Sequence, residues 1–294
     1  MHKSLLSLAV ASTIAFTTTD VQSHDTKTPS MKHSSQSLSA VLDKMPEKAK
    51  ARFDARNPQQ TLEFFGIKPG MTVIEALPGH GWYSKILLPY LGKQGKLIGA
   101  DYSMEMFPKF GFFSQERLDA KKTWVQDWTK DANGWRNENS ASVSAFQLGA
   151  MPEEVSGTAD AVVFIRALHN LARFEHDGGF LTSALKETYK ALKPGGIVGV
   201  VQHKAPEISK DEWANGSKGY LKKSYLISQM KKAGFEYVDS SDININLKDK
   251  PVETDIVWRL PPSLATSREN EELKKEYLAV GESTRMTLTF RKPS

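Results

Sequence analysis

The chain contains no cysteine in its 294 residues. Structural disulfides, thiolate metal sites and cysteine nucleophiles are therefore excluded, and so is a lipid anchor attached through cysteine. After residue 23, no apolar run approaches the roughly 18 residues that a membrane-spanning helix needs, so no stable membrane anchor is expected. The hydrolase motif G-x-S-x-G is also missing, which leaves a serine hydrolase without support.

Charge of one sign is not concentrated anywhere in the sequence. The 39 Lys and Arg residues exceed the 34 Asp and Glu residues by only five, and the basic residues are scattered. We therefore expect no nucleic acid as a partner. The histidines are few as well, and the spacing of His169, His176 and Asp177 matches no known ligand pattern, so we expect no metal.

The first residues have the pattern of a secretory signal peptide. Lys3 supplies a positive start, residues 5–16 are mostly apolar, and Val21 and Ser23 are suitable residues before a cleavage site. We expect a signal peptide over residues 1–23, a disordered leader over 24–37 and one domain over 38–294, and hence a periplasmic or secreted protein. The alternative is an ordinary frayed N-terminus.

Strand-like and helix-like segments alternate along the rest of the chain. Helices are expected at 58–65, 83–91, 180–192 and 221–233, with Asn57 as the cap of the first and a turn at 193–196 after the third. Strands are expected at 71–76, 96–101, 143–147, 160–165, 197–202, 235–238 and 286–291. This alternation predicts an α/β fold with a mostly parallel sheet and helices on both faces.

A glycine-containing turn, Pro78-Gly79-His80-Gly81, joins the first strand to a helix. Glycines allow a ligand to approach the backbone, and the start of a helix offers free N–H groups. Asp101 ends the next strand, where a carboxylate can accept hydrogen bonds from both ribose hydroxyls of a nucleoside. The alternative is that the glycines only tighten a turn and that Asp101 caps the segment after it.

The residues around this turn favour S-adenosylmethionine over NAD. A dinucleotide site requires a third glycine, where this chain has Ser84, and the bulky Trp82 and Tyr83 would crowd a diphosphate. Glu75, just before the turn, would repel a pyrophosphate but suits an ammonium or sulfonium group.

Segment 75–81, E-A-L-P-G-H-G, resembles motif I of the class I S-adenosylmethionine-dependent methyltransferases. Asp101 matches the acid after their second strand, and segments 192–196, 233–235 and 285–290 resemble their turns before strands five and six and their antiparallel last strand. The resemblance implies a Rossmann-like, seven-stranded, mostly parallel sheet with an antiparallel last strand. The stretch 64–83 and segment 168–170 further resemble an exported bacterial subgroup of predicted methyltransferases. Leu77 departs from the motif, because it replaces the first glycine.

The resemblance also assigns candidate site residues. The residues expected to bind the cofactor are Glu75, Pro78, Gly79, His80, Gly81, Asp101, Tyr102 and Arg166. His169 is the candidate general base, because an imidazole titrates near neutral pH. Asn170 would orient the acceptor, and Arg166 is also suited to an acidic group of the substrate. The alternative for His169 is a hydrogen-bonded structural histidine.

These features predict a methyltransferase that acts on a small or apolar acceptor. The aromatic residues between Phe107 and Trp135 form either a lid or acceptor pocket, or the core of a helical segment. Two other functions remain open: a non-catalytic exported protein that retains the fold, and an NAD-dependent oxidoreductase.

Overall fold

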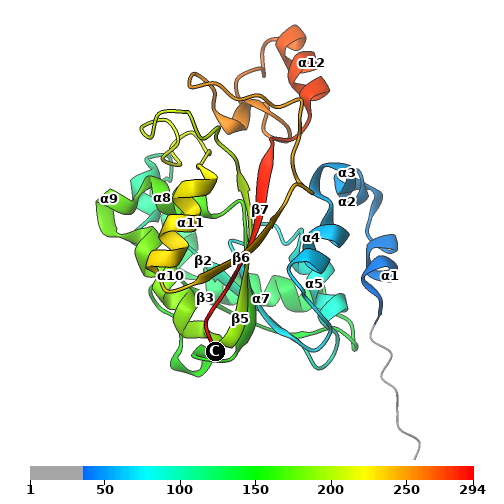
Figure 1. The fold of residues 1–294 in the computed structure, drawn as a ribbon. Helices are drawn as coiled ribbons and strands as arrows, with labels where there is room; N and C mark the ends of the chain where they lie inside the picture. The colour runs from blue at the N-terminus through cyan, green and yellow to red at the C-terminus, as the bar shows by residue number, and fades with distance from the viewer. Residues whose placement is uncertain (1–35) are drawn as a thin grey trace, which may run out of the picture. The chain divides into compact units, whose positions relative to one another are not determined.

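A computed structural model describes residues 36–294. A seven-stranded sheet with the order β3-β2-β1-β4-β5-β7-β6 forms its centre (Figure 1). The strands are β1 (Thr72–Ala76), β2 (Lys96–Asp101), β3 (Ser142–Gln147), β4 (Ala159–Ile165), β5 (Leu192–His203), β6 (Glu236–Ser241) and β7 (Arg285–Arg291). β1 to β5 pair in parallel, whereas β7 pairs antiparallel with both β5 and β6. The predicted fold class is therefore confirmed.

Twelve α-helices and three short 3₁₀ helices surround the sheet within residues 36–294. The α-helices are α1 (Leu38–Asp43), α2 (Glu47–Lys50), α3 (Phe53–Arg56), α4 (Pro58–Phe64), α5 (Ser84–Leu91), α6 (Gln115–Lys122), α7 (Trp124–Gly134), α8 (Leu168–Arg173), α9 (Glu175–Gly178), α10 (Phe180–Ala191), α11 (Lys223–Lys232) and α12 (Glu271–Val280). The 3₁₀ helices are η1 (Phe107–Phe110), η2 (Glu153–Val155) and η3 (Val257–Arg259). None of the helices in this part of the chain has the length and apolar character needed to cross a membrane.

The helices divide between the two faces of the sheet because successive strand residues point in opposite directions. Ile74 of β1 packs in a cluster with residues of α8, α10 and α11, whereas its neighbour Val73 packs with residues of α1, α4, α5 and α7. Both faces of the parallel strands are thus buried, which explains why these strands are continuous apolar runs in the sequence. The predicted signal peptide and residues 24–35 of the predicted leader lie outside the described residues.

Two local predictions differ from the structure. The turn expected at 193–196 lies inside β5, as a bulge between the pairs Ala159–Leu192 and Ala161–Ile197. Lys292 continues the ladder there, because its carbonyl accepts from the N–H of Gly195 and its own N–H donates to Gly196. Asn57 stands at the start of α4 but makes no side-chain cap. It adopts a left-handed conformation and donates its side-chain amide to the carbonyl of Ile243 instead.

The topology gathers several loops at one edge of the sheet. β1, β2, β4 and β5 all end at this edge because they are parallel, and the antiparallel β7 begins there. Figure 1 shows α12 and its flanking loops beyond the same edge. In open α/β sheets, ligands bind outside the carboxyl ends of the parallel strands, so this edge is where a site is expected.

Candidate functional site

Two cavities at this edge share three lining residues, Leu77, Tyr102 and Asn170. The first, here called the loop cavity, has a volume of about 500 Å³. The second, here called the histidine cavity, has a volume of about 320 Å³. Both volumes are typical of sites for small ligands. The structure therefore places two small-molecule volumes next to each other at the predicted edge.

The loop cavity lies against the predicted glycine turn. Gly79 and His80 of that turn line it, and Gly79 has a φ of +55° with open space where a Cβ atom would stand. The cavity also has an aromatic wall, formed by Phe107, Phe110, Phe112, Phe113 and Trp124. This part of the aromatic segment therefore lines a cavity, whereas Trp128 is buried in the helical core beside β2.

Asp101 provides the acid of the loop cavity. Its Oδ1 accepts from the backbone N–H of Tyr102 at 2.9 Å, and its Oδ2 accepts from Lys121 Nζ at 2.7 Å. Burial raises the pKa of Asp101, although the ammonium group of Lys121 opposes the shift. An ionised carboxylate can accept about four hydrogen bonds, so capacity for ligand hydroxyls remains. An acid beside an aromatic wall and an open glycine bend fits a nucleoside.

Three predicted cofactor residues, Glu75, Pro78 and Gly81, are not among the residues that line the two cavities within 36–294. A Cβ atom at Gly81 would clash with the ring of Trp135, and the φ of +75° at this position also favours glycine. Glu75 is buried, and its Oε2 accepts from Ser84 Oγ at 2.6 Å. Burial raises the pKa of Glu75 to about 7, against the opposing effect of the Ser84 hydrogen bond.

Two residues other than glycine have a positive φ at the same edge. Leu77 directly follows β1 with a φ of +53°, and Arg166 directly follows β4 with a φ of +59°. Residues other than glycine rarely adopt this left-handed backbone region, and each one that does raises the free energy of the folded state by about 1 kcal/mol or more. In this conformation the Leu77 side chain lines both cavities and the Arg166 side chain lines the histidine cavity.

His169, at the start of α8, lines the histidine cavity with a defined tautomer. Gln202 Nε2 donates to the carbonyl of Gly219 at 2.9 Å, which orients the amide so that Oε1 faces His169. This oxygen lies 3.3 Å from the backbone N of His169 and 3.4 Å from Nδ1. Nδ1 therefore carries the hydrogen, and Nε2 keeps the lone pair.

The titration of His169 differs from the near-neutral value that a histidine suggests in a sequence. Burial lowers the pKa of His169 to about 4, because the protonated ring would lose its hydration and would lie near Arg166 and Arg173. The hydrogen bond to Gln202 opposes the shift but does not cancel it. His169 is therefore an uncharged acceptor throughout the neutral range.

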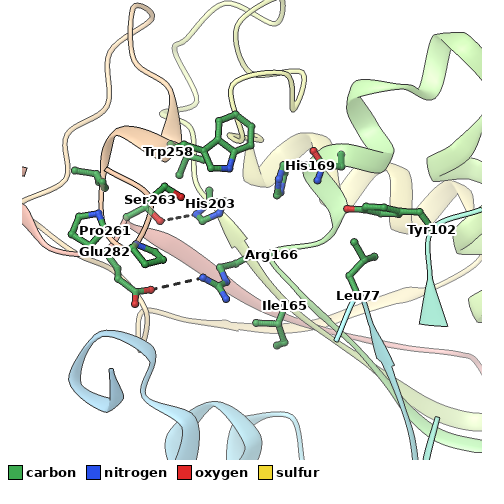
Figure 2. A pocket seen from close by; sticks show the side chains of 15 residues that line it. Leu77, Tyr102, Ile165, Arg166, His169, His203, Trp258, Pro261, Ser263 and Glu282 are labelled. Carbon is green, nitrogen blue, oxygen red and sulfur yellow. Dashed lines mark hydrogen bonds and ion pairs between the residues drawn. The ribbon is translucent and has the colours of Figure 1, made fainter. Parts of the chain in front are cut away.

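A second histidine, His203, was not predicted as a site residue. It ends β5, its ring centroid lies 5.5 Å from that of His169, and its Nδ1 lies 2.6 Å from Ser283 Oγ. Burial lowers the pKa of His203 well below 6.5. Figure 2 shows the two imidazoles facing the cavity, with Trp258 of η3 across from them. Trp258 comes from the polar segment 240–283, where the sequence pattern gives no sign of a site.

Comparison with known proteins supports the fold. No protein-family model matches the chain, and no curated protein matches it. Among solved structures, the chain is similar to the [4+2]-cyclase SpnF, with 17% identity, a TM-score of 0.50, and coverage of 81% of this chain and 80% of that one. It is also similar to geranyl diphosphate C-methyltransferase from Streptomyces coelicolor A3(2), with 12% identity, a TM-score of 0.50, and coverage of 86% and 87%. These likenesses show a shared Rossmann-like fold.

Proposed function

We propose that the chain is an S-adenosylmethionine-dependent methyltransferase that acts on a small acceptor. The observation that carries this proposal is the pair of adjoining cavities, which share Leu77, Tyr102 and Asn170. A transfer between two ligands needs both of them in adjacent, oriented positions, and positioning alone can contribute about 7–11 kcal/mol. The shared fold adds support, because the Streptomyces coelicolor enzyme was solved with S-adenosyl-L-homocysteine and geranyl diphosphate.

Each cavity has its own part in the proposed reaction. S-adenosylmethionine would supply an electrophilic methyl group from its sulfonium centre. Gly79, Asp101 and the aromatic wall would hold its adenosyl part in the loop cavity. The acceptor would occupy the histidine cavity, where His169 Nε2 takes a proton from an acceptor that must lose one. Leu77 and Asn170, which line both cavities, would set the approach of the two ligands.

Calorimetry with S-adenosylhomocysteine and with NAD tests this proposal. We expect micromolar binding of S-adenosylhomocysteine, and binding at least tenfold weaker in Asp101→Asn, because the amide accepts fewer hydrogen bonds from the ribose. In Lys121→Ala we expect equal or tighter binding, because the competing ammonium group is removed from Asp101. Asp119→Asn, which changes an exposed acid of α6, is the matched control.

Three outcomes of this calorimetry and of a methyl-transfer assay on the same protein are decisive. Binding of NAD without S-adenosylhomocysteine would indicate an oxidoreductase and would refute the proposal. Equal affinity in Asp101→Asn and in Asp119→Asn would remove Asp101 from the site. Binding of S-adenosylhomocysteine without methyl transfer to any acceptor would favour the non-catalytic alternative.

We also propose that the protein is exported, which rests on the signal-peptide pattern of residues 1–23. Expression of the full chain in a Gram-negative bacterium should give a periplasmic or secreted protein whose first residue is His24. Fractionation followed by amino-terminal sequencing measures this directly. A cytosolic product that still begins at residue 1 or 2 would contradict export.

A further inference from the structure

Four arginines surround a single carboxylate beside the histidine cavity. This arginine cluster consists of Arg52, Arg56, Arg166 and Arg285. Glu282 Oε1 lies 2.8 Å from Arg52 Nε and 3.3 Å from Arg56 Nε. Its Oε2 lies 3.3 Å from Arg285 Nη1 and 3.9 Å from Arg166 Nη1. Within residues 36–294, Glu282 is the only carboxylate within ion-pair distance of these four groups, so three positive charges remain uncompensated.

Another buried arginine shows how unusual this balance is for the same chain. Arg259 Nη2 lies 2.8 Å from Asp249 and its Nε lies 3.0 Å from Asp255, so one guanidinium has two carboxylates. In the arginine cluster four guanidinium groups share one carboxylate, although the Arg56 and Arg285 side chains are only 5% and 4% exposed. Arg285 donates to the carbonyl oxygens of Ser283 and Ala55, and the Arg56 guanidinium lies 4.6 Å from the centroid of the Trp82 ring. These partners are uncharged, so they do not balance the excess positive charge, which is costly to bury.

Arg166 is the member of the cluster that faces the cavity. It lines the histidine cavity together with Glu282, and Figure 2 shows its guanidinium between Glu282 and the two imidazoles. Its buried Nε has no hydrogen-bond partner among the described residues, and its ion pair with Glu282 is long. A planar, permanently charged donor with free N–H groups is suited to a carboxylate or phosphate.

The remaining lining of the histidine cavity combines polar and apolar side chains, and the polar ones include Asn170, Ser263 and Ser283. The apolar ones are Leu77, Ile165, Val257, Leu260 and two prolines, with the indole of Trp258 facing His169 at a centroid distance of 5.9 Å. A ligand that fills this volume would therefore place an apolar or aromatic body against these side chains and an acidic group against Arg166.

We propose that the arginine cluster binds an anionic group of the methyl acceptor, so that the substrate is a small organic acid with an apolar body. The assignment of this ligand as the acceptor rests on the proposed function, whereas anion binding by the cluster does not. The excess of three positive charges attracts the acid, and Arg166 supplies the direct donors. The same binding would place an acceptor atom of the substrate near His169 Nε2.

The proposed ligand also has a consequence for His169. Arg166 contributes to the low pKa of His169 through charge repulsion, after the larger effect of burial. An anion bound to Arg166 offsets that repulsion and raises the pKa of His169 toward the neutral range. The base would then become stronger when the acidic substrate is bound.

Titration of the full chain with benzoate, benzamide and inorganic phosphate in low-chloride buffer tests the proposal. Benzoate carries an acid on an apolar ring, and benzamide has the same shape without the charge. We expect benzoate to bind at least tenfold more tightly than benzamide, and this preference to be lost in Arg166→Gln. Arg173→Gln, an arginine of α8 outside the cluster, should keep it. Phosphate binding tighter than benzoate would assign a phosphate in place of a carboxylate.

The controls separate this proposal from the proposed function. Equal binding of benzoate and benzamide to the wild-type protein would overturn the anion site. An unchanged preference for benzoate in folded Arg166→Gln would do the same, and either result would leave the proposed function intact if S-adenosylhomocysteine binds normally. Should Arg166→Gln not fold, Arg52→Gln replaces it, because Arg52 also pairs with Glu282 but is not among the residues within 36–294 that line the cavity. The comparison of benzoate with benzamide in the wild-type protein remains decisive in that case. Loss of benzoate binding under saturating S-adenosylhomocysteine would show that the cluster holds the cofactor's own carboxylate, and would overturn the acceptor assignment. Benzoate binding without any binding of S-adenosylhomocysteine would refute only the proposed function.

Discussion

Replacing Glu282 with glutamine is expected to lower the free energy of unfolding by about 3 kcal/mol or more, because it leaves buried guanidinium groups without a counter-charge. Burial alone would raise the pKa of Glu282, but Arg56, Arg285 and Arg52 together hold it below its ordinary value. The carboxylate is therefore ionised at neutral pH, and its removal exposes the mutual repulsion of the four arginines. Urea denaturation at pH 7 measures the loss.

The loss of stability in Glu282→Gln should depend on the anions in solution and on pH. Sulfate should restore more stability to Glu282→Gln than chloride does at equal ionic strength, because it can occupy the place of the carboxylate. Since the folded pKa of Glu282 is lowered, its contribution is present above the unfolded value of about 4.5 and is lost as the pH falls through the folded value. Glu276→Gln, an exposed acid of α12, is the control. Equal stabilities of these two variants would contradict the inferred role of Glu282.

Replacing Glu75 with glutamine is expected to increase the free energy of unfolding at alkaline pH. The folded pKa of Glu75 is about 7, above the ordinary value of 4.5. The folded protein thus binds a proton more tightly than the unfolded chain, and the stabilisation is complete below about pH 4.5 and lost as the pH rises through 7. At pH 8 the buried charge costs about 3 kcal/mol, and the amide, which keeps a hydrogen bond to Ser84, should recover about 2 kcal/mol of this.

Thermal unfolding of Glu75→Gln and of wild type at pH 5 and pH 8 checks this prediction. For a domain of this size, about 2 kcal/mol corresponds to an increase in melting temperature of roughly 4 °C or more at pH 8, and little change is expected at pH 5. Glu154→Gln alters an exposed glutamate and should change neither value. A lower melting temperature of Glu75→Gln at pH 8 would show that the ionised carboxyl is stabilised by groups other than Ser84.

Most of the sheet was predictable because its strands obey a local rule. Residues 160–165 and 197–202 have the pattern of buried strands, since both faces of β4 and β5 are covered by helices and most positions are apolar or small. The bulge at 193–196 was not predictable, because it depends on pairing with Lys292, almost a hundred residues later. The residues around 193–196 contain no pattern that indicates such a distant partner.

The candidate site was predictable only in part, for the same reason. Gly79 and Asp101, which line the loop cavity, were identified because Gly79 lies in the turn that follows β1 and Asp101 ends β2. Arg52 and Glu282 are 230 residues apart in sequence, and neither lies in a motif. The one local signal was a pair of charged residues, Glu282 and Arg285, at the start of a strand that is otherwise buried. Charged side chains are unusual at such a position.

The position of β7 between β5 and β6 has a consequence for how the protein is made. Within residues 36–294, β6 pairs with the rest of the sheet only through β7, which follows the other six strands in sequence. A nascent chain on the ribosome therefore has no completed sheet until residues 285–291 have left the exit tunnel. Glu282 and Arg285 arrive with that strand, so the charge network around them is assembled last, and a truncation before residue 282 removes it entirely.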